Sequence, residues 1–336
     1  DADEPMDWDR LRSAVHTAVR FLDRVIDINY YPTEAAGRSN EGWRPVGLGV
    51  MGLQDVFFAR RLAFDAPEAL ALSTRIAEEI YLAALDASVG LAAEAGAPHP
   101  RYAETWAARG KLQPDLWGVE TTDPRWTPLR ERIAEHGLRN SLLIAIAPTA
   151  TIASIAGCYE CIEPAVSNLF KRETLSGEFL QINTCLVRDL QARGLWDDRM
   201  IDRLRAAGGS IQDLDDIPDD LKAVYRTAWE IPQRSLIDLA AARGPFLDQS
   251  QSLNLFLESP TIGKLSSMYA YAWKQGLKTT YYLRSRPATR IASATGGGGG
   301  AATRPTPGPG ASAPAPADDE AVTCSLEDPE SCEACQ

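Results

Sequence analysis

Apolar residues recur at helical spacing in three stretches of the chain. A first helix is predicted to begin after Asp7, whose carboxylate can cap the first turn, and to end before Tyr31 and Pro32. Its apolar face consists of Leu11, Val15, Val19, Leu22 and Ile26. The same spacing predicts a long helix over about 68–94 and a shorter one over 265–275, with Gly276 as its C-cap.

Short continuous apolar runs between these helices are typical of buried strands. They cover residues 45–50 and 141–146, and the first contains glycines that let backbones approach closely. Residues 278–284, which follow the predicted C-cap Gly276, are predicted to form a further strand. Helices that alternate with buried strands indicate an α/β body with a parallel sheet. We expect this body to span residues 1–294.

Composition changes sharply after that body. Residues 295–317 are rich in Gly, Pro and Ala, cannot bury a core, and are predicted to form a flexible linker. Residues 318–336 follow as a short acidic tail that carries a CxxC pair, Cys332 and Cys335. A plain disordered tail leaves these two cysteines unexplained.

Charge, apolar run length and cysteine content argue against several classes of protein. The chain of 336 residues has 34 basic and 46 acidic residues, a net charge of −12, which argues against nucleic-acid binding. No apolar run is long enough for a membrane span, and the acidic start resembles neither a signal nor a transit peptide. Six cysteines are too few for a disulfide scaffold, so we expect a cytoplasmic, reducing location.

A turn rich in small hydroxyl residues follows the apolar run 141–146. It contains Thr149 and Thr151 and precedes a predicted helix start. Backbone N–H groups and hydroxyls at such a turn can bind a phosphate. A capped helix without a ligand accounts for the same residues.

Two adjacent tyrosines and two CxxC pairs are further candidates for chemistry. On a strand, Tyr281 and Tyr282 would point to opposite faces, either as amphipathic sheet residues or as a relay for one-electron oxidation across the sheet. Cys332 and Cys335 favour reversible disulfide exchange. Alternatively they form a zinc site with Cys158 and Cys161, which are otherwise small buried apolar residues.

Taken in order, these segments resemble the large (α) subunit of class I ribonucleotide reductase. The resemblance covers residues 10–290 and the C-terminal thiol pair. The matching runs are Ile26–Pro32, Arg44–Val50, Gly137–Leu143, Ala147–Thr151, Ile162–Pro164, Leu175–Phe179, Asp248–Asn254 and Gly276–Leu283.

The resemblance implies a fold and a role for each segment. The fold is the C-terminal half of a ten-stranded α/β barrel, followed by a flexible tail. Substrate diphosphate would bind at Thr149, Ala150, Thr151 and Ile152, where Ile152 replaces a frequent hydroxyl residue and offers only its backbone N–H. Tyr281 and Tyr282 would carry radical transfer from a metal-containing small (β) subunit. Cys332 and Cys335 would reduce the active-site disulfide and be re-reduced by thioredoxin or glutaredoxin.

Other family features are missing from the sequence. No Asn-x-Cys-x-Glu loop for the radical-forming cysteine precedes Ile26, and Asn183-Thr-Cys185 does not qualify because Val187 stands where Glu is required. The active-site disulfide and the sites for nucleotide effectors are absent with it. We therefore expect a split or truncated large subunit that binds no cofactor or metal itself and needs an N-terminal half.

Three alternatives remain at this stage. A non-catalytic remnant would only pair with the N-terminal half. An adenosylcobalamin-dependent reductase would not need the tyrosine pair, and a thioredoxin-like reductase would place its CxxC in a βαβ unit, which is absent here. A half-barrel alone would have open sheet edges, so we expect the isolated chain to self-associate.

Overall fold

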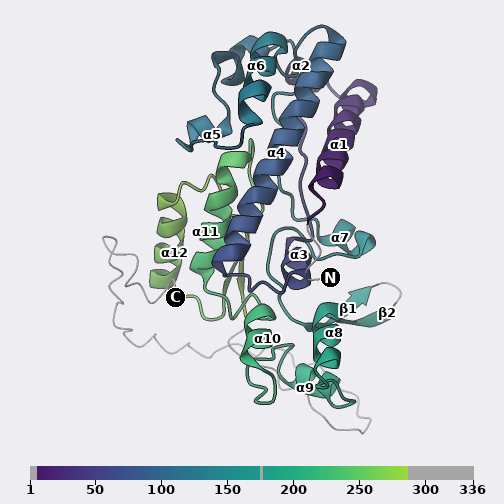
Figure 1. The fold of residues 1–336 in the computed structure, drawn as a ribbon, viewed down its shortest axis with the longest axis vertical. Coiled ribbons are helices and arrows are strands. Elements are labelled where there is room, and N and C mark those ends of the chain that lie inside the picture. Colours follow the sequence, from purple (N-terminus) through teal and green to yellow (C-terminus); the bar gives the residue numbers. More distant parts are fainter. Residues whose placement is uncertain (1–5, 175–176, 287–336) are drawn as a thin grey trace, which may run out of the picture.

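The computed structural model describes residues 6–174 and 177–286, and Figure 1 shows their arrangement. The linker 295–317 and the tail with Cys332 and Cys335 lie outside the described residues. No helix in the described ranges is long and apolar enough to cross a membrane. The helices are α1 (Trp8–Ile28), α2 (Glu34–Trp43), α3 (Leu53–Ala59), α4 (Pro67–Ala95), α5 (Gln113–Leu116), α6 (Trp126–His136), α7 (Ala150–Ala156), α8 (Thr184–Ala192), α9 (Met200–Ala206), α10 (Asp219–Val224), α11 (Gln233–Arg243) and α12 (Ile262–Lys274), with short 3₁₀ turns at Tyr102–Glu104, Ala107–Arg109 and Gly244–Phe246. The strands are β1 (Leu169–Thr174), β2 (Gly177–Ile182), β3 (Leu255–Leu257) and β4 (Leu283–Ser285).

Four extended segments form a parallel array at the centre of the fold. Backbone hydrogen bonds join residues 46–48 to 142–145, these to 249–252, and 253–257 to 281–285. Within this array only β3 and β4 form a regular ladder; the predicted strands 45–50 and 141–146 meet as an isolated bridge, Leu48 with Ile144. Gly49 shows why the first two segments come so close: a Cβ there would lie 2.6 Å from the Ala145 carbonyl oxygen.

The three predicted helices are confirmed. Asp7 caps α1 by accepting a hydrogen bond from the Arg10 N–H, and α1 packs along α4 (Figure 1). The long helix α4 crosses the main core and is buried on most sides over residues 80–85, as expected of a helix that is apolar all round. Helix α12 ends at Lys274, and Gly276 follows in the left-handed conformation (φ 80°).

A second, smaller core lies between β1 and helices α8, α9 and α10. Its members include Leu186, Leu190, Met200 and Leu204, all fully buried. The antiparallel pair of β1 and β2 extends beside this core (Figure 1). The four-segment array and α4 belong to the larger core.

A buried arginine joins three of the runs on which the family resemblance rests. Arg44 donates from Nε to the Asp23 carboxylate (3.0 Å) and from Nη1 to Asp27 (2.8 Å). Asn140 donates to both the Asp23 carboxylate (2.9 Å) and the Arg44 carbonyl (3.1 Å). These side chains attach α1 to the first two extended segments, which is a structural role.

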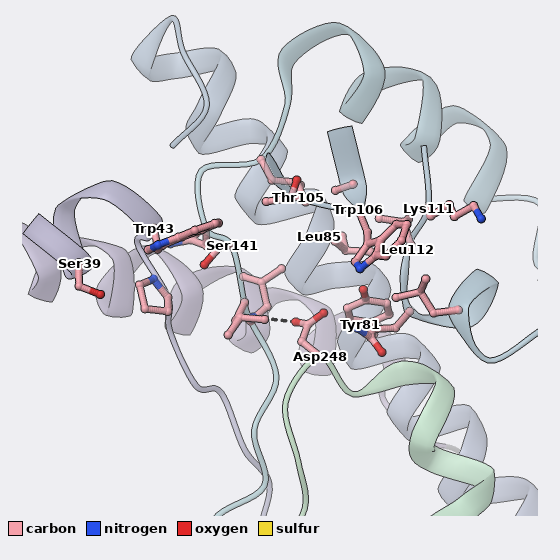
Figure 2. A pocket seen from close by; sticks show the side chains of 18 residues that line it. Ser39, Trp43, Tyr81, Leu85, Thr105, Trp106, Lys111, Leu112, Ser141 and Asp248 are labelled. Carbon is pink, nitrogen blue, oxygen red and sulfur yellow. Dashed lines mark hydrogen bonds between the residues drawn. The ribbon is translucent and has the colours of Figure 1, made fainter. Parts of the chain in front are cut away.

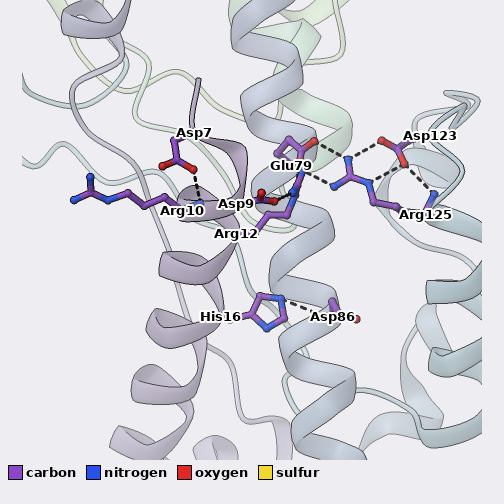
Figure 3. A network of polar contacts seen from close by, with 9 residues as sticks. All are labelled: Asp7, Asp9, Arg10, Arg12, His16, Glu79, Asp86, Asp123 and Arg125. Atoms are coloured by element: carbon purple, nitrogen blue, oxygen red, sulfur yellow. Dashed lines mark hydrogen bonds and ion pairs between the residues drawn. The ribbon is translucent and has the colours of Figure 1, made fainter. Parts of the chain in front are cut away.

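A second polar network connects α1, α4 and the loop before α6 (Figure 3). The buried carboxylate of Glu79 accepts hydrogen bonds from Arg12 (2.9 Å) and from both Nη atoms of Arg125 (2.9 and 2.6 Å). Burial alone would raise the pKa of Glu79, but these two arginines outweigh it and lower the pKa. Asp123 pairs with the same Arg125 guanidinium. The network holds its charges paired at neutral pH.

Candidate functional site

The two adjacent tyrosines lie directly before β4 and contact each other. Their ring centroids are 4.1 Å apart, the ring planes meet at 58°, and the two hydroxyl oxygens are 3.4 Å apart. The Tyr281 N–H donates to the Leu253 carbonyl (2.8 Å), and the Tyr282 carbonyl accepts from the Leu255 N–H (2.9 Å). Both side chains are about half exposed, at 52% and 53%.

The predicted orientation of this pair is wrong. Side chains on a regular strand would alternate between faces, but the strand begins only at Leu283, and both rings turn toward each other. The hydrogen bond between the hydroxyls raises the pKa of Tyr281. The two phenols are therefore in hydrogen-bond contact and about half exposed.

Two buried polar residues lie behind the pair. Asn254 is 3% exposed, and its Oδ1 accepts a hydrogen bond from the Tyr282 N–H (3.2 Å). Glu163 is also buried, and burial raises the pKa of its carboxyl to about 7 against the lowering effect of Asn254. Both residues stand in runs that resemble the family, and membership in those runs was the only sequence signal for them.

The hydroxyl-rich turn lies at the carboxyl end of the segment 142–146. Helix α7 begins at Ala150, and its first intrahelical bond runs from the Ala153 N–H to the Thr149 carbonyl. The N–H groups of Ala150, Thr151 and Ile152 precede that bond, and all three residues are exposed. Thr149 adopts the left-handed conformation (φ 56°), and its Oγ1 accepts from the Cys161 N–H (2.8 Å). The turn is therefore fixed by the loop that follows α7.

Contacts through that loop connect the turn to the tyrosine pair. Cys161 bonds Thr149 through its N–H, and its Sγ lies 3.6 Å from the carbonyl oxygen of Ser252. Ser252 and Asn254 belong to the same segment, and the Oδ1 of Asn254 accepts a hydrogen bond from the Tyr282 N–H. The structure thus joins the two predicted site segments through neighbouring elements.

Cys158 and Cys161 are free thiols in the structure. Burial raises the pKa of both, that of Cys161 to about 12, so neither is an activated thiolate. Cys161 is 1% exposed, which fits the interpretation as a small core residue. No cluster of three or more His, Cys, Asp or Glu side chains suited to a metal occurs among the described residues. The zinc alternative also involves Cys332 and Cys335, which the structure does not describe.

Figure 2 shows a cavity of about 440 Å³ at the opposite, amino end of the extended segments. Trp43, Trp106 and Tyr81 lie around it, and the Asp248 carboxylate accepts hydrogen bonds from the N–H groups of Leu143 (2.7 Å) and Ile144 (3.1 Å). Burial raises the pKa of Asp248, against the lowering effect of the two backbone N–H donors and of Tyr81. None of the site residues predicted from the sequence lines this cavity.

A second cavity, of about 590 Å³, borders the later part of α7 and the strands β1 and β2. Ser154, Cys158, Asn183 and Cys185 contribute to its wall, whereas Thr149–Ile152 do not. Asn183 accepts hydrogen bonds from the N–H groups of Cys185 and Leu186 and so caps α8. This capping role explains the Asn-x-Cys pattern without radical chemistry.

Comparison with known proteins identifies the family. A sequence model described as "Ribonucleotide reductase, barrel domain" matches residues 1–283. The chain belongs to this family. The predicted resemblance to ribonucleotide reductase large subunits is thereby confirmed, and the helical and extended segments agree with a mixed α/β fold.

Curated relatives of this chain are named as large subunits of ribonucleoside-diphosphate reductase. The chain is 48% identical over 295 residues to the "Ribonucleoside-diphosphate reductase large subunit" of Caenorhabditis elegans, covering 87% of this chain and 37% of the relative. The protein of that name from Arabidopsis thaliana is 44% identical over 335 residues, covering 98% of this chain and 41% of the relative. The chain therefore spans about 40% of the length of these relatives.

A solved structure has a similar fold. The alpha subunit of the Actinobacillus ureae class Id ribonucleotide reductase superposes with a TM-score of 0.64 and 27% sequence identity. The match covers 82% of this chain and 46% of that chain. Sequence and fold thus agree on the family.

Proposed function

We propose that this chain is part of a ribonucleoside-diphosphate reductase large subunit and forms the C-terminal half of its ten-stranded α/β barrel. The family assignment and the curated relatives support the reaction class. The contact between Tyr281 and Tyr282 carries the proposal, because two hydrogen-bonded phenols suit stepwise one-electron oxidation. The whole enzyme would replace the 2′-hydroxyl of a ribonucleoside diphosphate with hydrogen.

The tyrosine pair would transfer the oxidising equivalent. When one phenol is a phenoxyl radical, its neighbour gives up one electron and one proton, which regenerates the first phenol. A separation of 3.4 Å between the hydroxyl oxygens supports this exchange, and the raised pKa of Tyr281 keeps the proton available for it. The half-exposed rings leave a route for electron transfer from a small (β) subunit whose metal centre generates the radical.

The turn over Thr149–Ile152 would hold the substrate diphosphate. Ligands of open α/β sheets bind beyond the carboxyl ends of the strands, and the turn lies at such an end. The backbone N–H groups of Ala150, Thr151 and Ile152 would donate to the phosphate oxygens. The hydroxyl of Thr149 already accepts from the Cys161 N–H, so it would donate its own hydrogen.

Cys332 and Cys335 would return electrons to the active site. In thiol–disulfide exchange the tail dithiol becomes a disulfide while the active-site disulfide becomes two thiols, and thioredoxin or glutaredoxin then reduces the tail. The linker 295–317 would give the tail its reach. An N-terminal half would supply the radical-forming cysteine, the active-site disulfide and the sites for nucleotide effectors. The sequence motifs and composition fit a cytoplasmic enzyme.

The test is turnover by the chain combined with the small subunit, an N-terminal half and thioredoxin. We expect Tyr281→Phe to abolish deoxynucleotide formation, whereas Tyr269→Phe, a change at another exposed tyrosine, retains it. Full activity of the Tyr281→Phe enzyme would refute the radical path and favour an adenosylcobalamin-dependent reductase. Pairing of the halves without any turnover would favour a non-catalytic remnant.

A further inference from the structure

We propose that Lys278 is a positioning residue whose ammonium group fixes the tyrosine pair relative to the turn over Thr149–Ile152, the proposed phosphate turn. The consequence for catalysis rests on the proposed function, but the contacts of Lys278 are testable in this chain alone. Lys278 lies in the extended segment that connects α12 to the tyrosine pair and β4. Four oxygen atoms lie within hydrogen-bond distance of its Nζ atom, and they connect this segment to two other parts of the fold.

Three of the four acceptors are consecutive backbone carbonyls. Nζ of Lys278 donates to the carbonyl oxygens of Leu247 (2.8 Å), Asp248 (3.0 Å) and Gln249 (3.1 Å). A fourth contact joins Nζ to Oε1 of Gln113 in α5 (3.2 Å). An ammonium group has three N–H donors, so these oxygens are enough to occupy all of them. Hydrogen bonds from a charged donor are also stronger than those from a neutral one.

The ammonium makes the first contact of a pairing that continues to the tyrosine pair. Thr279 and Ser250 follow, with their hydroxyl groups in hydrogen-bond contact. The Tyr281 N–H then donates to the Leu253 carbonyl at 2.8 Å. The two segments thus stay side by side over this stretch, and the lysine holds them together where the stretch begins.

Side chains alone make the hydrogen bonds in the first part of this pairing. In the part of the chain that the structure describes, no backbone hydrogen bond joins residues 278–280 to residues 247–251. Without the ammonium, the hydroxyl contact of Thr279 is the hydrogen bond that remains between them. Local opening of a segment becomes more frequent as its contacts are lost. We therefore expect the chain before Tyr281 to open more often when Lys278 is replaced.

The segment that accepts from the lysine is bonded on its other side to the run that leads into the phosphate turn. The Gln249 N–H donates to the Ile144 carbonyl (3.1 Å), and the Ile146 N–H donates to the Ser250 carbonyl (3.0 Å). The phosphate turn begins shortly after this run, at Thr149. One segment therefore has the tyrosine pair on one side and the run before the phosphate turn on the other. Backbone bonds fix the second of these, whereas the lysine fixes the start of the first.

Loss of the lysine should therefore impair radical transfer and leave substrate binding intact. Radical exchange between the phenols depends on their position, and a displacement of about 1 Å can cost up to about a hundredfold in the rate of a reaction. The bonds that hold the phosphate turn, from Ile146 and from the Cys161 N–H to Thr149, do not involve Lys278. The two effects are thus separable in kinetics.

The direct test is hydrogen–deuterium exchange in the full 336-residue chain, with mass spectrometry of the peptide over residues 278–283. Lys278→Met keeps an unbranched side chain without donors, and we expect deuterium uptake in this peptide to become about tenfold faster, the typical effect of one lost charge-assisted bond. Lys278→Arg retains charged donors and should recover most of the protection. Lys264→Met removes the same charge from an exposed position of α12 and should leave uptake unchanged. Equal uptake in the wild type and Lys278→Met would refute the proposal.

Peptides from α4 show whether each variant is folded. If Lys278→Met also exposes α4, the ammonium is observed directly in the wild-type chain labelled with ¹⁵N-lysine. The chain has six lysines, and Lys278→Arg and Lys264→Arg identify the two relevant signals by their loss. The ammonium protons of Lys278 should exchange with water more slowly than those of Lys264. Equally fast exchange of both would refute the contacts on which the proposal depends.

Turnover separates this inference from the proposed function. In a reconstituted reductase we expect Lys278→Met to lower kcat at least about tenfold with KM unchanged, and Lys278→Arg to recover most of that loss. A raised KM with kcat unchanged would contradict the positioning role, because it would place the effect at the phosphate turn. Faster exchange in Lys278→Met of a chain that never supports turnover would refute the proposed function alone. Full turnover by the Lys278→Met enzyme would refute the positioning role alone.

Discussion

Replacing Arg44 with Met should destabilise the fold far more than removing an exposed arginine. The Arg44 guanidinium is almost fully buried and bonds the carboxylates of Asp23 and Asp27 and the Asp23 carbonyl. Arg44 also adopts a left-handed backbone conformation (φ 47°). Methionine carries a Cβ as well, so backbone strain is similar in both proteins and cancels in the comparison.

The expected magnitude follows from the charges left behind. Arg44→Met leaves the buried carboxylate of Asp23 with the Asn140 amide (2.9 Å) and the more distant Arg139 guanidinium (3.8 Å) as its remaining partners. Removing one partner of a buried ion pair typically costs about 3–5 kcal/mol. This corresponds to a more than hundredfold loss in the folding equilibrium constant, since each ~1.4 kcal/mol is a factor of ten. Arg44→Lys keeps the charge but not the planar fork and should lose less.

Urea unfolding followed by circular dichroism and tryptophan fluorescence measures this difference. The matched control is Arg38→Met, because Arg38 is 72% exposed and pairs with the exposed Glu34 on the same helix. Such surface pairs contribute roughly 0–1 kcal/mol. If Arg44→Met and Arg38→Met lower the free energy of unfolding equally, the stabilising role of the buried Arg44 network is refuted.

Three further predictions concern the same chain. Because the pKa of Glu79 is lowered in the folded chain, its ionised carboxylate stabilises the fold above the unfolded pKa of about 4.3. This stabilisation is lost as pH falls through the folded pKa. In unfolding curves measured over a pH series, Glu79→Gln should therefore lose less stability on acidification than the wild type. Cys161 should resist iodoacetamide at pH 7.5 in the native chain and react after unfolding, as mass spectrometry would show; rapid native labelling would contradict its burial. The isolated chain should self-associate in sedimentation velocity, whereas a cooperatively melting monomer would argue against open edges.

Helices were predictable from the sequence because their signals are local. The apolar spacing of α1 and α4 and the cap at Asp7 involve residues close in the chain. The extended segments 45–50 and 141–146 were located correctly, whereas the predicted strand 278–284 is regular only from Leu283. Segments 45–50 and 141–146 make single bridges, because the extent of a ladder depends on the relative path of two distant segments.

The site was predictable in its residues but not in its geometry. The sequence identified Tyr281 and Tyr282, yet alternation along a strand gave the wrong orientation, since the pair lies before β4 begins. Asn254 received no role because its contact with Tyr282 joins residues 28 positions apart (282 − 254) and exists only in the folded chain. The turn at Thr149 was located, but its bond to the Cys161 N–H depends on the loop after α7.

Reduction of a ribonucleoside diphosphate tests the central claim most directly. The chain is mixed with a small subunit and thioredoxin, with and without a separately produced N-terminal half, and deoxynucleotide formation is measured. We predict product only when both the small subunit and the N-terminal half are present. Product without either of them, or none despite demonstrated pairing of the halves, would contradict the account.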